Sequence, residues 1–318
     1  MLGLGIRAMN EILKRFLKTR VRPIMVPFVK AYIRYFPIDA SKRPVWKLLA
    51  PFLEFASHEF AASTFFQAYM TGNTHDIIDR YIYYFGVWEP NLTAFIGRRL
   101  APGDVFVDIG ANTGYYTLWG ARLVGAEGSV IAVEASPTIF QILNNHLVQN
   151  GVTNVRAVNV AASNRPGKVR LYRGPEWNRG GSTIIGDDLS LLEGEVPALP
   201  LQTILQPEEV RRTRFVKIDV EGAEWLVAEG MAPLFAYGRK DLEVVIEVSP
   251  KCLAAVGHSA NEIVDLFDAA GFHTYELSND YSFESYLPPR TVSSPIRVRG
   301  PIHKQTDIVF SRIDAEEL

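Results

Sequence analysis

The chain has 318 residues, of which 47% are hydrophobic and 21% are charged, and its formal net charge is −2. This composition is typical of a soluble globular protein, and the length allows one main domain with an appendage. The single cysteine, Cys252, excludes an internal disulfide framework and favours a reducing cytoplasm, and no nucleic-acid partner is expected.

The first fifty residues differ in charge from the rest of the chain. They carry eleven Lys and Arg against only Glu11 and Asp39, which gives +9, so the remaining residues sum to −11. A basic amphipathic arm suggests peripheral contact with anionic lipid on the inner membrane surface or with another polyanion, although a solvated charged face of a docking helix is the commoner explanation. The amino-terminal sequence lacks the pattern of a secretory signal, so the expected location is cytoplasmic.

Residues 1–75 are predicted to form a helical, basic region. Apolar residues recur at helical spacing over 9–35, with breaks expected at Pro23 and Pro27. Residues 45–70 are rich in Phe, Leu and Ala, but charged residues interrupt them, so no run approaches the roughly 18 uncharged residues of a membrane span. The region acts as a lid, contacts a membrane surface or pairs in a homodimer, and the sequence leaves these alternatives open.

A catalytic domain is predicted over residues 76–318. It begins with a helical stripe that ends at Gly86, and the sequence Trp88-Glu89-Pro90 follows. Glu89 precedes a proline in a loop that should approach the ligand site, where its carboxylate contacts the cofactor or a substrate hydroxyl. A simple helix-capping acid is the alternative.

Residues 104–114 read Asp-Val-Phe-Val-Asp-Ile-Gly-Ala-Asn-Thr-Gly, which predicts a buried parallel strand followed by a glycine turn. Gly110 and Gly114 permit a tight turn and close approach of a ligand to the backbone, and the next helix offers unpaired N–H groups. A second apolar run, 130–133, ends in Glu134, where an acid at the carboxyl end of a strand can accept both ribose hydroxyls. This pattern predicts a nucleotide-binding site.

The glycine loop also indicates which nucleotide binds. A dinucleotide fold would read Gly-x-Gly-x-x-Gly, but Asn112 stands at the place of the second glycine, so a pyrophosphate would be poorly bound. S-Adenosylmethionine has no phosphate and carries an amino-acid tail and a sulfonium cation, which suit a polar loop beside Asp108. An oxidoreductase that uses the same nucleotide fold is the less favoured alternative.

A third strand is expected over 155–160, and Ala161 and Ala162 follow it. Their small side chains leave room for an adenine ring against the sheet, or simply allow tight packing. Residues 164–200 break the regular alternation and are interpreted as an insertion over the site, with an antiparallel strand over 168–173. The residues expected to contact a sugar-like acceptor are Trp177, Asn178, Arg179 and Ser182.

Carboxylates follow two further predicted strands. Asp219 and Glu221 come directly after the strand 214–218, and Glu247 lies at the end of the strand 242–248, so all three are expected at the ligand edge of the sheet. Asp219 is predicted to lie nearest the methyl group and Glu221 to orient or deprotonate the acceptor, with Glu247 as the next candidate. Three carboxylates are thus expected to converge there.

Two further ionisable residues, Glu224 and His258, are expected near these carboxylates in the sequence or in the fold. Glu224 is interpreted as a structural cap of the helix that follows, and His258 is either an alternative base or a solvent-facing loop residue. The six histidines are scattered singly and no Cys/His cluster exists, so no metal site is predicted.

The carboxyl-terminal part determines the direction of the last strand. A strand over 272–277 is followed by an irregular segment, 278–306, and by a final strand over 307–311. Because no crossover helix separates the two strands, the last one is predicted to run antiparallel. The fold class is therefore α/β, with a doubly wound sheet, an antiparallel last strand and a helical N-terminal region.

The sequence at these positions resembles the FkbM family of S-adenosylmethionine-dependent methyltransferases over about residues 80–275. The motifs are Trp88-Glu89-Pro90, Val107-Asp-Ile-Gly-Ala-Asn-Thr-Gly-Tyr-Tyr116, Val133-Glu134, Ser136-Pro137, Ala161-Ala-Ser163, Gly167, Lys217-Ile-Asp-Val-Glu-Gly-Ala-Glu224 and Ile246-Glu247. The resemblance implies a seven-stranded Rossmann-like methyltransferase sheet and methyl transfer to a hydroxyl of a sugar, glycolipid or polyketide. At 201–205 the chain reads Leu-Gln-Thr-Ile-Leu where the family shows Thr-Leu-Asp-x-Leu, so any role of that Asp is absent.

The expected ligands are S-adenosylmethionine and a small-molecule, glycan or lipid-linked acceptor. A non-catalytic, membrane-associated scaffold is the second alternative to a methyltransferase. The residues expected to bind the cofactor are Glu89, Asp108, Gly110, Ala111, Asn112, Gly114, Tyr115, Tyr116, Glu134, Ala135, Ala161, Ala162 and Asp219.

Overall fold

The computed structural model describes residues 22–53, 57–186, 191–288 and 290–318. The chain divides into two compact units, one made of Met1–Trp88 with Tyr281–Thr291 and the other of Glu89–Asp280 with Val292–Leu318. The division therefore falls at Trp88, later than the expected boundary at residue 76. The helix just before it belongs to the first unit because it packs on the helix and hairpin of that unit.

The first unit is not helical throughout, so that part of the prediction is wrong. Residues 59–73 form an antiparallel hairpin, because the side chains of its first strand alternate between exposed and buried positions. Of the predicted basic arm, residues 1–50, the first 21 residues lie outside the described part of the chain. The elements of this unit are α2 (Arg22–Tyr35), α3 (Lys42–Leu53), β1 (Glu59–Ser63), β2 (Tyr69–Asn73), α4 (Ile77–Phe85) and α14 (Phe283–Tyr286).

The expected break at Pro27 does not occur, since α2 continues through that proline. The hydrogen bond that Pro27 cannot donate would have reached the carbonyl of Pro23 in the first turn, so the helix loses one bond near its end. Aromatic rings from α3, α4 and α14 then pack together, with Trp46 and Tyr81 each in ring contact with Phe283. Segments about 200 residues apart in the sequence thus share one core.

The second unit is built on an eight-stranded sheet in the order β12-β11-β13-β10-β9-β3-β4-β5. Neighbouring strands from β10 to β5 pair in parallel, and β13 pairs antiparallel with both β10 and β11. The antiparallel last strand is thus confirmed, and seven of the strands are those predicted. The strands are β3 (Val105–Ile109), β4 (Ser129–Val133), β5 (Val155–Val158), β9 (Thr213–Ile218), β10 (Glu243–Val248), β11 (His273–Leu277), β12 (Ile296–Arg297) and β13 (Thr306–Ser311).

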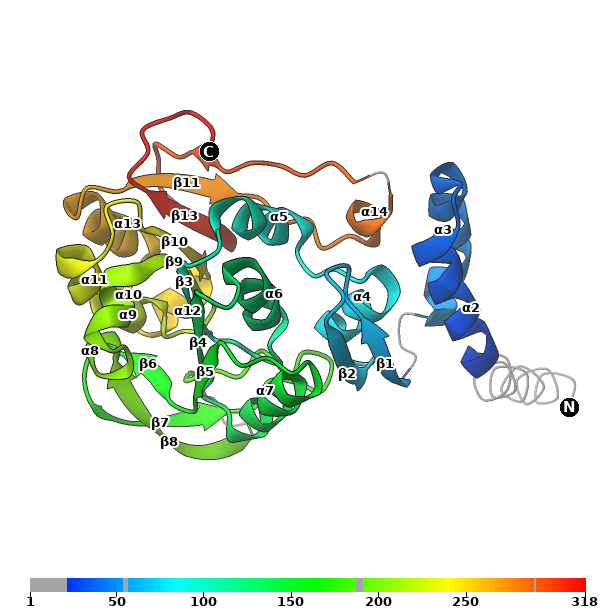
Figure 1. Cartoon of the computed structure of the whole chain (residues 1–318), viewed down its shortest axis with the longest axis horizontal. Coiled ribbons are helices and arrows are strands. Elements are labelled where there is room, and N and C mark those ends of the chain that lie inside the picture. The colour runs from blue at the N-terminus through cyan, green and yellow to red at the C-terminus, as the bar shows by residue number, and fades with distance from the viewer. Residues whose placement is uncertain (1–21, 54–56, 187–190, 289) are drawn as a thin grey trace, which may run out of the picture. The chain divides into compact units, whose positions relative to one another are not determined.

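The eighth strand, β12, lies in the segment that was predicted to be irregular and pairs with the edge strand β11. Helices cover both faces of the sheet (Figure 1), so the unit is a doubly wound α/β fold as predicted. One face carries α5 (Pro90–Arg99), α6 (Tyr115–Val124) and α7 (Pro137–Gln149). The other carries α8 (Leu201–Ile204), α9 (Pro207–Arg212), α10 (Glu224–Glu229), α11 (Ala232–Tyr237), α12 (Pro250–Ala255) and α13 (Ala260–Ala269).

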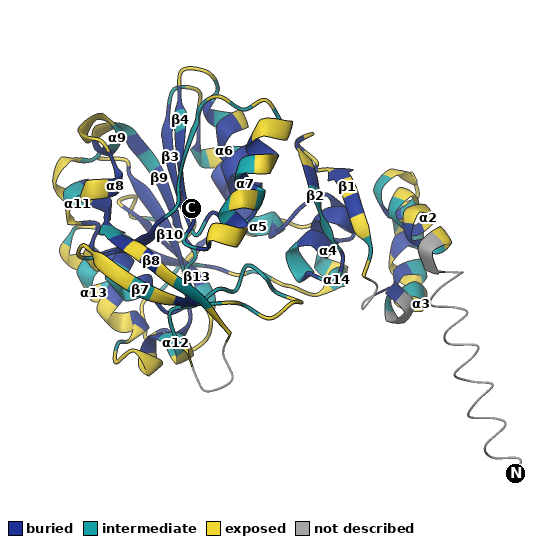
Figure 2. Ribbon diagram, turned by 90° about the horizontal axis from the view of Figure 1, so that it is seen from below, coloured by how far each residue is buried: buried dark blue, intermediate teal, exposed yellow. Residues whose placement is uncertain are grey.

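The sheet is buried on both faces (Figure 2), which explains the continuous apolar runs in its sequence. Phe95 of α5 and Phe106 of β3 pack against Phe215 of β9 on one face. The start of α7 is also as predicted, because the Ser136 hydroxyl accepts the N–H of Ile139 and Pro137 occupies the first turn.

The expected insertion forms a small sheet of its own. Its strands are β6 (Ala161–Ser163), β7 (Gly167–Tyr172) and β8 (Leu192–Pro200), in the order β6-β8-β7. β7 pairs antiparallel with β8, which confirms the antiparallel strand predicted over 168–173. β6 pairs in parallel with β8, so the alanines after the third strand become part of this second sheet.

Candidate active site

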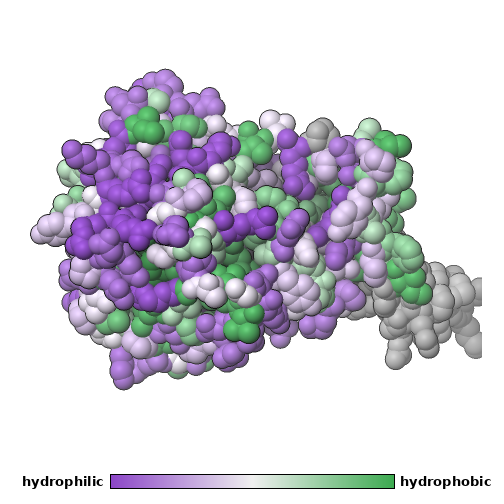
Figure 3. Space-filling model, in the orientation of Figure 1, coloured by the Kyte–Doolittle hydropathy of each residue, from purple (hydrophilic) through white to green (hydrophobic). Residues whose placement is uncertain are grey.

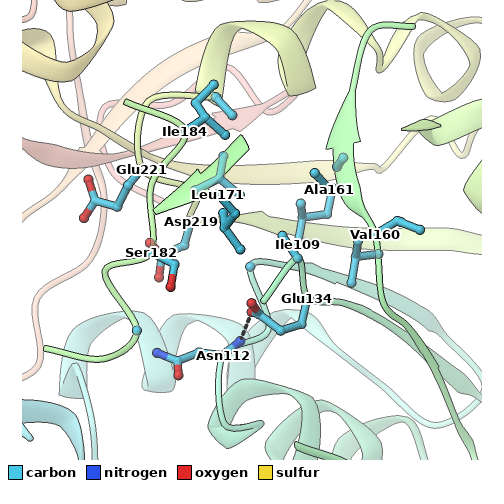
Figure 4. A pocket seen from close by; sticks show the side chains of 17 residues that line it. Ile109, Asn112, Glu134, Val160, Ala161, Leu171, Ser182, Ile184, Asp219 and Glu221 are labelled. Atoms are coloured by element: carbon cyan, nitrogen blue, oxygen red, sulfur yellow. Dashed lines mark hydrogen bonds between the residues drawn. The ribbon is translucent and has the colours of Figure 1, made fainter. Parts of the chain in front are cut away.

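A pocket lies at the carboxyl ends of β3, β4 and β9 (Figure 4) and holds about 600 Å³ of empty space, its open mouth included. In a doubly wound sheet, ligands bind at this edge near the reversal of strand order, which here lies between β3 and β9. The residues that line it are Ile109, Gly110, Asn112, Val133, Glu134, Ala135, Val160, Ala161, Ala162, Leu171, Gly180, Ser182, Ile184, Asp219, Val220, Glu221 and Ala223.

The glycine turn after β3 brings two strand ends into close contact. Gly110 has a φ of +74°, and a Cβ atom at this position would lie 1.8 Å from the backbone oxygen of Asp219. The N–H groups of Gly110 and Ala111 both donate to the carbonyl of Val133, at 2.9 and 3.0 Å. The turn is therefore fixed from both sides, by β4 and by the end of β9, and only glycine fits at its first position.

Glu134 lies at the end of β4 and faces the glycine turn. Its Oε2 accepts the N–H of Asn112 and its Oε1 accepts the N–H of Ser136, both at 2.8 Å. Burial raises the pKa of Glu134 to about 7, although these two backbone donors act in the opposite direction. The carboxylate is held in one orientation at the pocket wall (Figure 4), as a receptor for ribose hydroxyls requires.

Cofactor affinity should therefore depend on pH. Only the ionised form of Glu134 can accept two hydroxyl hydrogen bonds, so protonation below about pH 7 removes acceptor capacity. The dissociation constant of S-adenosylhomocysteine should be constant above about pH 8 and should rise by up to about tenfold for each pH unit below 7. Calorimetric titrations from pH 6 to 9 measure it. Glu134→Gln should bind more weakly at every pH without this slope, and a flat wild-type profile would refute the role.

A buried ion network lies beneath the glycine turn. The ammonium of Lys217 is 3.0 Å from Oδ2 of Asp219 and 3.9 Å from Oδ1 of Asp108, and it stands 5.1 Å from the ring centroid of Tyr116. Burial lowers the pKa of Lys217, but the carboxylates of Asp219 and Asp108 outweigh it, so the pKa is raised and the lysine stays charged.

Asp108 is fully buried at the end of β3. Its Oδ2 accepts the hydroxyl of Thr117 at 2.6 Å, whereas its Oδ1 has no hydrogen-bond partner within the described part of the chain. Burial raises the pKa of Asp108, and the nearby Lys217 opposes this shift. Asp108 does not line the pocket, and the ammonium of Lys217, 3.9 Å from its Oδ1, supplies the opposite charge at this oxygen.

Glu89 and Tyr116 contact each other rather than the pocket. The hydroxyl of Tyr116 donates to Oε2 of Glu89 at 2.7 Å, and both side chains are buried. Glu89 occupies the N-cap position of α5, but its side chain makes no capping hydrogen bond. Burial, followed by the nearby charge of Glu89, raises the pKa of Tyr116 well above its usual value. The phenol therefore stays protonated and donates a hydrogen bond to Glu89.

The three predicted carboxylates do not all converge on the pocket. Asp219 and Glu221 line it, but Glu247 does not. Glu247 lies opposite Asp307 of β13 and accepts a hydrogen bond from the Gln305 side chain at 2.7 Å. Burial, followed by the neighbouring acids, raises the pKa of both Glu247 and Asp307 well above their ordinary values.

The alternative base, His258, also lies away from the pocket lining. Its ring stacks on Trp225 with the centroids 4.8 Å apart, and its Nδ1 is 3.6 Å from a carboxylate oxygen of Glu262. Glu224 accepts the N–H of Gly222 at 3.2 Å just before α10, as expected of an acid at a helix start. Within the described ranges no cluster of His, Cys, Asp or Glu is arranged for a metal ion, and the metal-free site stays a prediction.

Of the four insertion residues that the sequence singled out, one reaches the pocket. Trp177, Asn178 and Arg179 do not line it, whereas Ser182 does. A Cβ atom on Gly180 would lie 1.9 Å from the side chain of Asn112, and the hydroxyl of Thr183 donates to the backbone oxygen of Glu221 at 2.8 Å. The segment 180–184 therefore crosses from the glycine turn to the end of β9 and forms one wall.

Other lining residues that the sequence did not single out are apolar. They are Ile109, Val133, Val160, Leu171, Ile184, Val220 and Ala223. Several of them end or follow a strand of the main sheet, which is the signal that could have identified them. Ala111, Gly114 and Tyr115 do not line the pocket but follow Gly110 in the turn and the first turn of α6.

The pocket fits the parts of S-adenosylmethionine. The apolar side chains of Val160, Ala162 and Leu171 suit a purine face, and Glu134 suits a ribose. The carboxylate of Asp219 in the pocket wall suits the cationic amino-acid end, while Asp108, which does not line the pocket, contacts the same ammonium of Lys217. These residues would hold the cofactor, and among them Glu134 and Asp219 are the predicted cofactor ligands that are both ionisable and part of the pocket wall.

The chain was compared with curated proteins and with solved structures. No curated protein matches the chain. Among solved structures it is similar to one described as an rRNA methylase from Clostridium thermocellum, with 10% identity and a TM-score of 0.44, over 72% of this chain and 98% of that one. It is also similar to a methyltransferase from Streptococcus mutans described in complex with SAH, with 10% identity and a TM-score of 0.39, over 73% and 99%. Likenesses this low support no statement about function.

The family comparison is more specific. The profile described as the methyltransferase FkbM domain matches residues 108–274, which is more than half of the chain. The match contains the glycine turn, Glu134, the small inserted sheet and the strand that ends before Asp219. The cofactor of this methyltransferase is S-adenosylmethionine, and the oxidoreductase and scaffold alternatives are not retained. The chain belongs to the FkbM methyltransferase domain family.

Proposed function

We propose that this methyltransferase acts on oxygen and transfers a methyl group to a hydroxyl of a sugar, glycolipid or polyketide-like acceptor. The observation that carries the proposal is the environment of Glu221. Its carboxylate belongs to the pocket wall, and no ion pair in the described part of the chain includes it. Its Oε2 contacts only a weak donor, the thiol of Cys252, at 3.8 Å. A carboxylate that has neither an ion pair nor a strong hydrogen-bond donor can accept a proton.

Bound S-adenosylmethionine supplies an electrophilic methyl group on a sulfonium. A hydroxyl is a poor nucleophile until its proton leaves, so the protein must supply a base at the acceptor oxygen. Burial raises the pKa of Glu221, which moves this carboxyl toward the working pH and makes it a stronger base. We assign to Glu221 the acceptance of the hydroxyl proton on its carboxylate.

Asp219 has a different position. Its Oδ2 lies 3.0 Å from the ammonium of Lys217, so the side chain is fixed in direction by an ion pair that Glu221 lacks. We assign Asp219 a positioning role at the cofactor end of the pocket. Most of the acceleration of an in-line displacement comes from such positioning, because the reacting atoms must be held collinear.

The insertion supports a carbohydrate-like acceptor. Trp177 is 55% exposed, and it precedes the segment 180–184 that forms a wall of the pocket. An exposed indole just before this wall in the sequence is a surface on which a sugar ring can stack, while Asn178 and Arg179 have side chains that can form hydrogen bonds. These residues remain the proposed acceptor contacts although they do not line the pocket itself.

The chemistry of the methylated product tests the proposal. The protein is incubated with methyl-tritiated S-adenosylmethionine and with polar and lipid extracts of cells. Label in O-methyl ethers, which resist mild base and hydroxylamine, is the expected result. Label found only in N-methyl or S-methyl groups would show that oxygen is not the acceptor atom.

Glu221→Gln should lower turnover by about 10²- to 10⁴-fold, because the variant cannot take the hydroxyl proton. The affinity for S-adenosylhomocysteine should stay within about twofold of the wild-type value, since the loss concerns a step after binding. Initial rates at saturating cofactor and calorimetric titration measure the two quantities. Glu208→Gln is the matched control, because Glu208 is exposed and paired with Arg211 in α9. Near-normal turnover of Glu221→Gln would remove the proposed base.

A further inference from the structure

The first unit has an apolar surface that its own core leaves uncovered. Helix α2 buries one stripe of side chains, which are Val26, Val29 and Ile33. A second stripe at helical spacing is exposed, with more than 60% of each side chain accessible, and it consists of Ile24, Phe28 and Tyr35. The helix therefore has two apolar faces, and among the described residues of the unit only one of these faces is buried.

The exposed stripe continues beyond the end of α2. Phe36 and Ile38 in the turn and Leu48 in α3 are exposed as well. Figure 3 shows hydrophobic side chains at the surface over α2 and α3. Soluble monomers rarely expose large apolar side chains in one continuous region unless the region binds something.

The charges beside this surface favour an anionic occupant. Arg43 and Lys47 are exposed one helical turn apart on α3, and no hydrogen bond or ion pair in the described residues includes them. The one acid of the segment, Asp39, is already paired with Lys42 at 2.7 Å. Over residues 1–50 the charge is +9. Apolar and aromatic side chains next to unpaired cations are the combination that binds the interface of an anionic membrane.

We propose that α2, the turn that follows it and α3 form a docking surface for an anionic lipid bilayer. In the described part of the chain no helix is both long and apolar enough to span a bilayer, so this contact lies at the membrane surface. A second copy of the chain is the poorer occupant, since two arms of +9 would be brought together. A nucleic acid would neutralise the cations but leave the apolar stripe in water.

Vesicle flotation of the full chain tests this proposal without cofactor or acceptor, so it stands apart from the proposed function. At low salt the protein should float with vesicles that contain about one-third phosphatidylglycerol. With vesicles of phosphatidylcholine alone it should remain in the bottom fraction of the gradient. Ile24→Ser/Phe28→Ser and, separately, Arg43→Glu/Lys47→Glu should each lower partitioning at least tenfold. The charge variant should also lose the salt dependence.

Two matched variants control for nonspecific loss. Val148→Ser/Tyr237→Ser removes exposed apolar side chains of the second unit, which are 80% and 74% accessible, and Arg122→Glu/Lys168→Glu reverses two exposed charges there. Both should float like the wild type. Three results would each overturn the proposal. The wild type does not float, or all variants float equally. In the third, the wild type is a dimer that Ile24→Ser/Phe28→Ser converts to a monomer without any change in flotation.

Discussion

Gly110→Ala should abolish binding of S-adenosylhomocysteine and destabilise the protein by about 2–5 kcal/mol. The residue has a φ of +74°, and its Cβ would lie 1.8 Å from the backbone oxygen of Asp219. Because that oxygen belongs to the backbone, it cannot rotate away, so β3 and the end of β9 must separate. Separation displaces the glycine turn, Asn112 and Asp219 together. Calorimetric titration and urea unfolding measure the two losses.

Gly151→Ala is the control for backbone strain alone. Gly151 has a φ of +62°, close to that of Gly110, but a Cβ atom at this position would have no neighbouring atom within 4 Å. This variant should lose only about 1 kcal/mol and bind the cofactor normally. If Gly110→Ala loses no more than Gly151→Ala and still binds, the contact between the turn and Asp219 does not shape the site.

Lys217→Met should cost about 3–5 kcal/mol of stability and most of the cofactor affinity. The change keeps the side-chain volume but leaves Asp108, fully buried, and Asp219 without their cation. Because the pKa of Lys217 is raised, the stability that its charge contributes is fully present below the unfolded lysine pKa and is lost only as the pH rises through the folded value. The wild-type contribution is therefore constant between pH 6 and 9.

The variant should behave differently with pH. Without Lys217 the pKa of Asp108 rises further above its ordinary value, and a carboxyl with a raised pKa stabilises the fold in its protonated form. Lys217→Met should thus regain stability as the pH falls from 8 to 6, as urea unfolding at several pH values can show. The double variant Lys217→Met/Asp108→Asn removes the stranded charge and should recover at least half of the loss. No recovery would mean that packing, not charge, explains the role of Lys217.

Much of the main fold could be predicted because its signals are local. The apolar run before Gly110, the acid after β4 and the Ser136-Pro137 cap each appear in a few consecutive residues. The antiparallel direction of β13 followed from the lack of a crossover helix before it. The same reasoning placed Gly110, Glu134, Asp219 and Glu221 at one edge of the sheet, where the pocket lies.

The parts that could not be predicted depend on partners far apart in the sequence. Glu247 is drawn into a pair with Asp307 by the register between β10 and β13, which no local pattern reveals. The wall 180–184 follows from contacts of Gly180 with Asn112 and of Thr183 with Glu221. The hairpin β1–β2 was included in a region predicted to be helical, because the richness of residues 45–70 in Phe, Leu and Ala does not distinguish short strands from helices.

Every role assigned to a pocket residue depends on S-adenosylmethionine binding at the glycine turn, and calorimetric titration at pH 8 tests this binding directly. S-Adenosylmethionine and S-adenosylhomocysteine should each give saturable binding of one molecule per chain, and Gly110→Ala should give none while Gly151→Ala binds normally. Well-folded wild-type protein that shows no binding of either compound, or a Gly110→Ala variant that keeps full affinity, would contradict the assignment of this site.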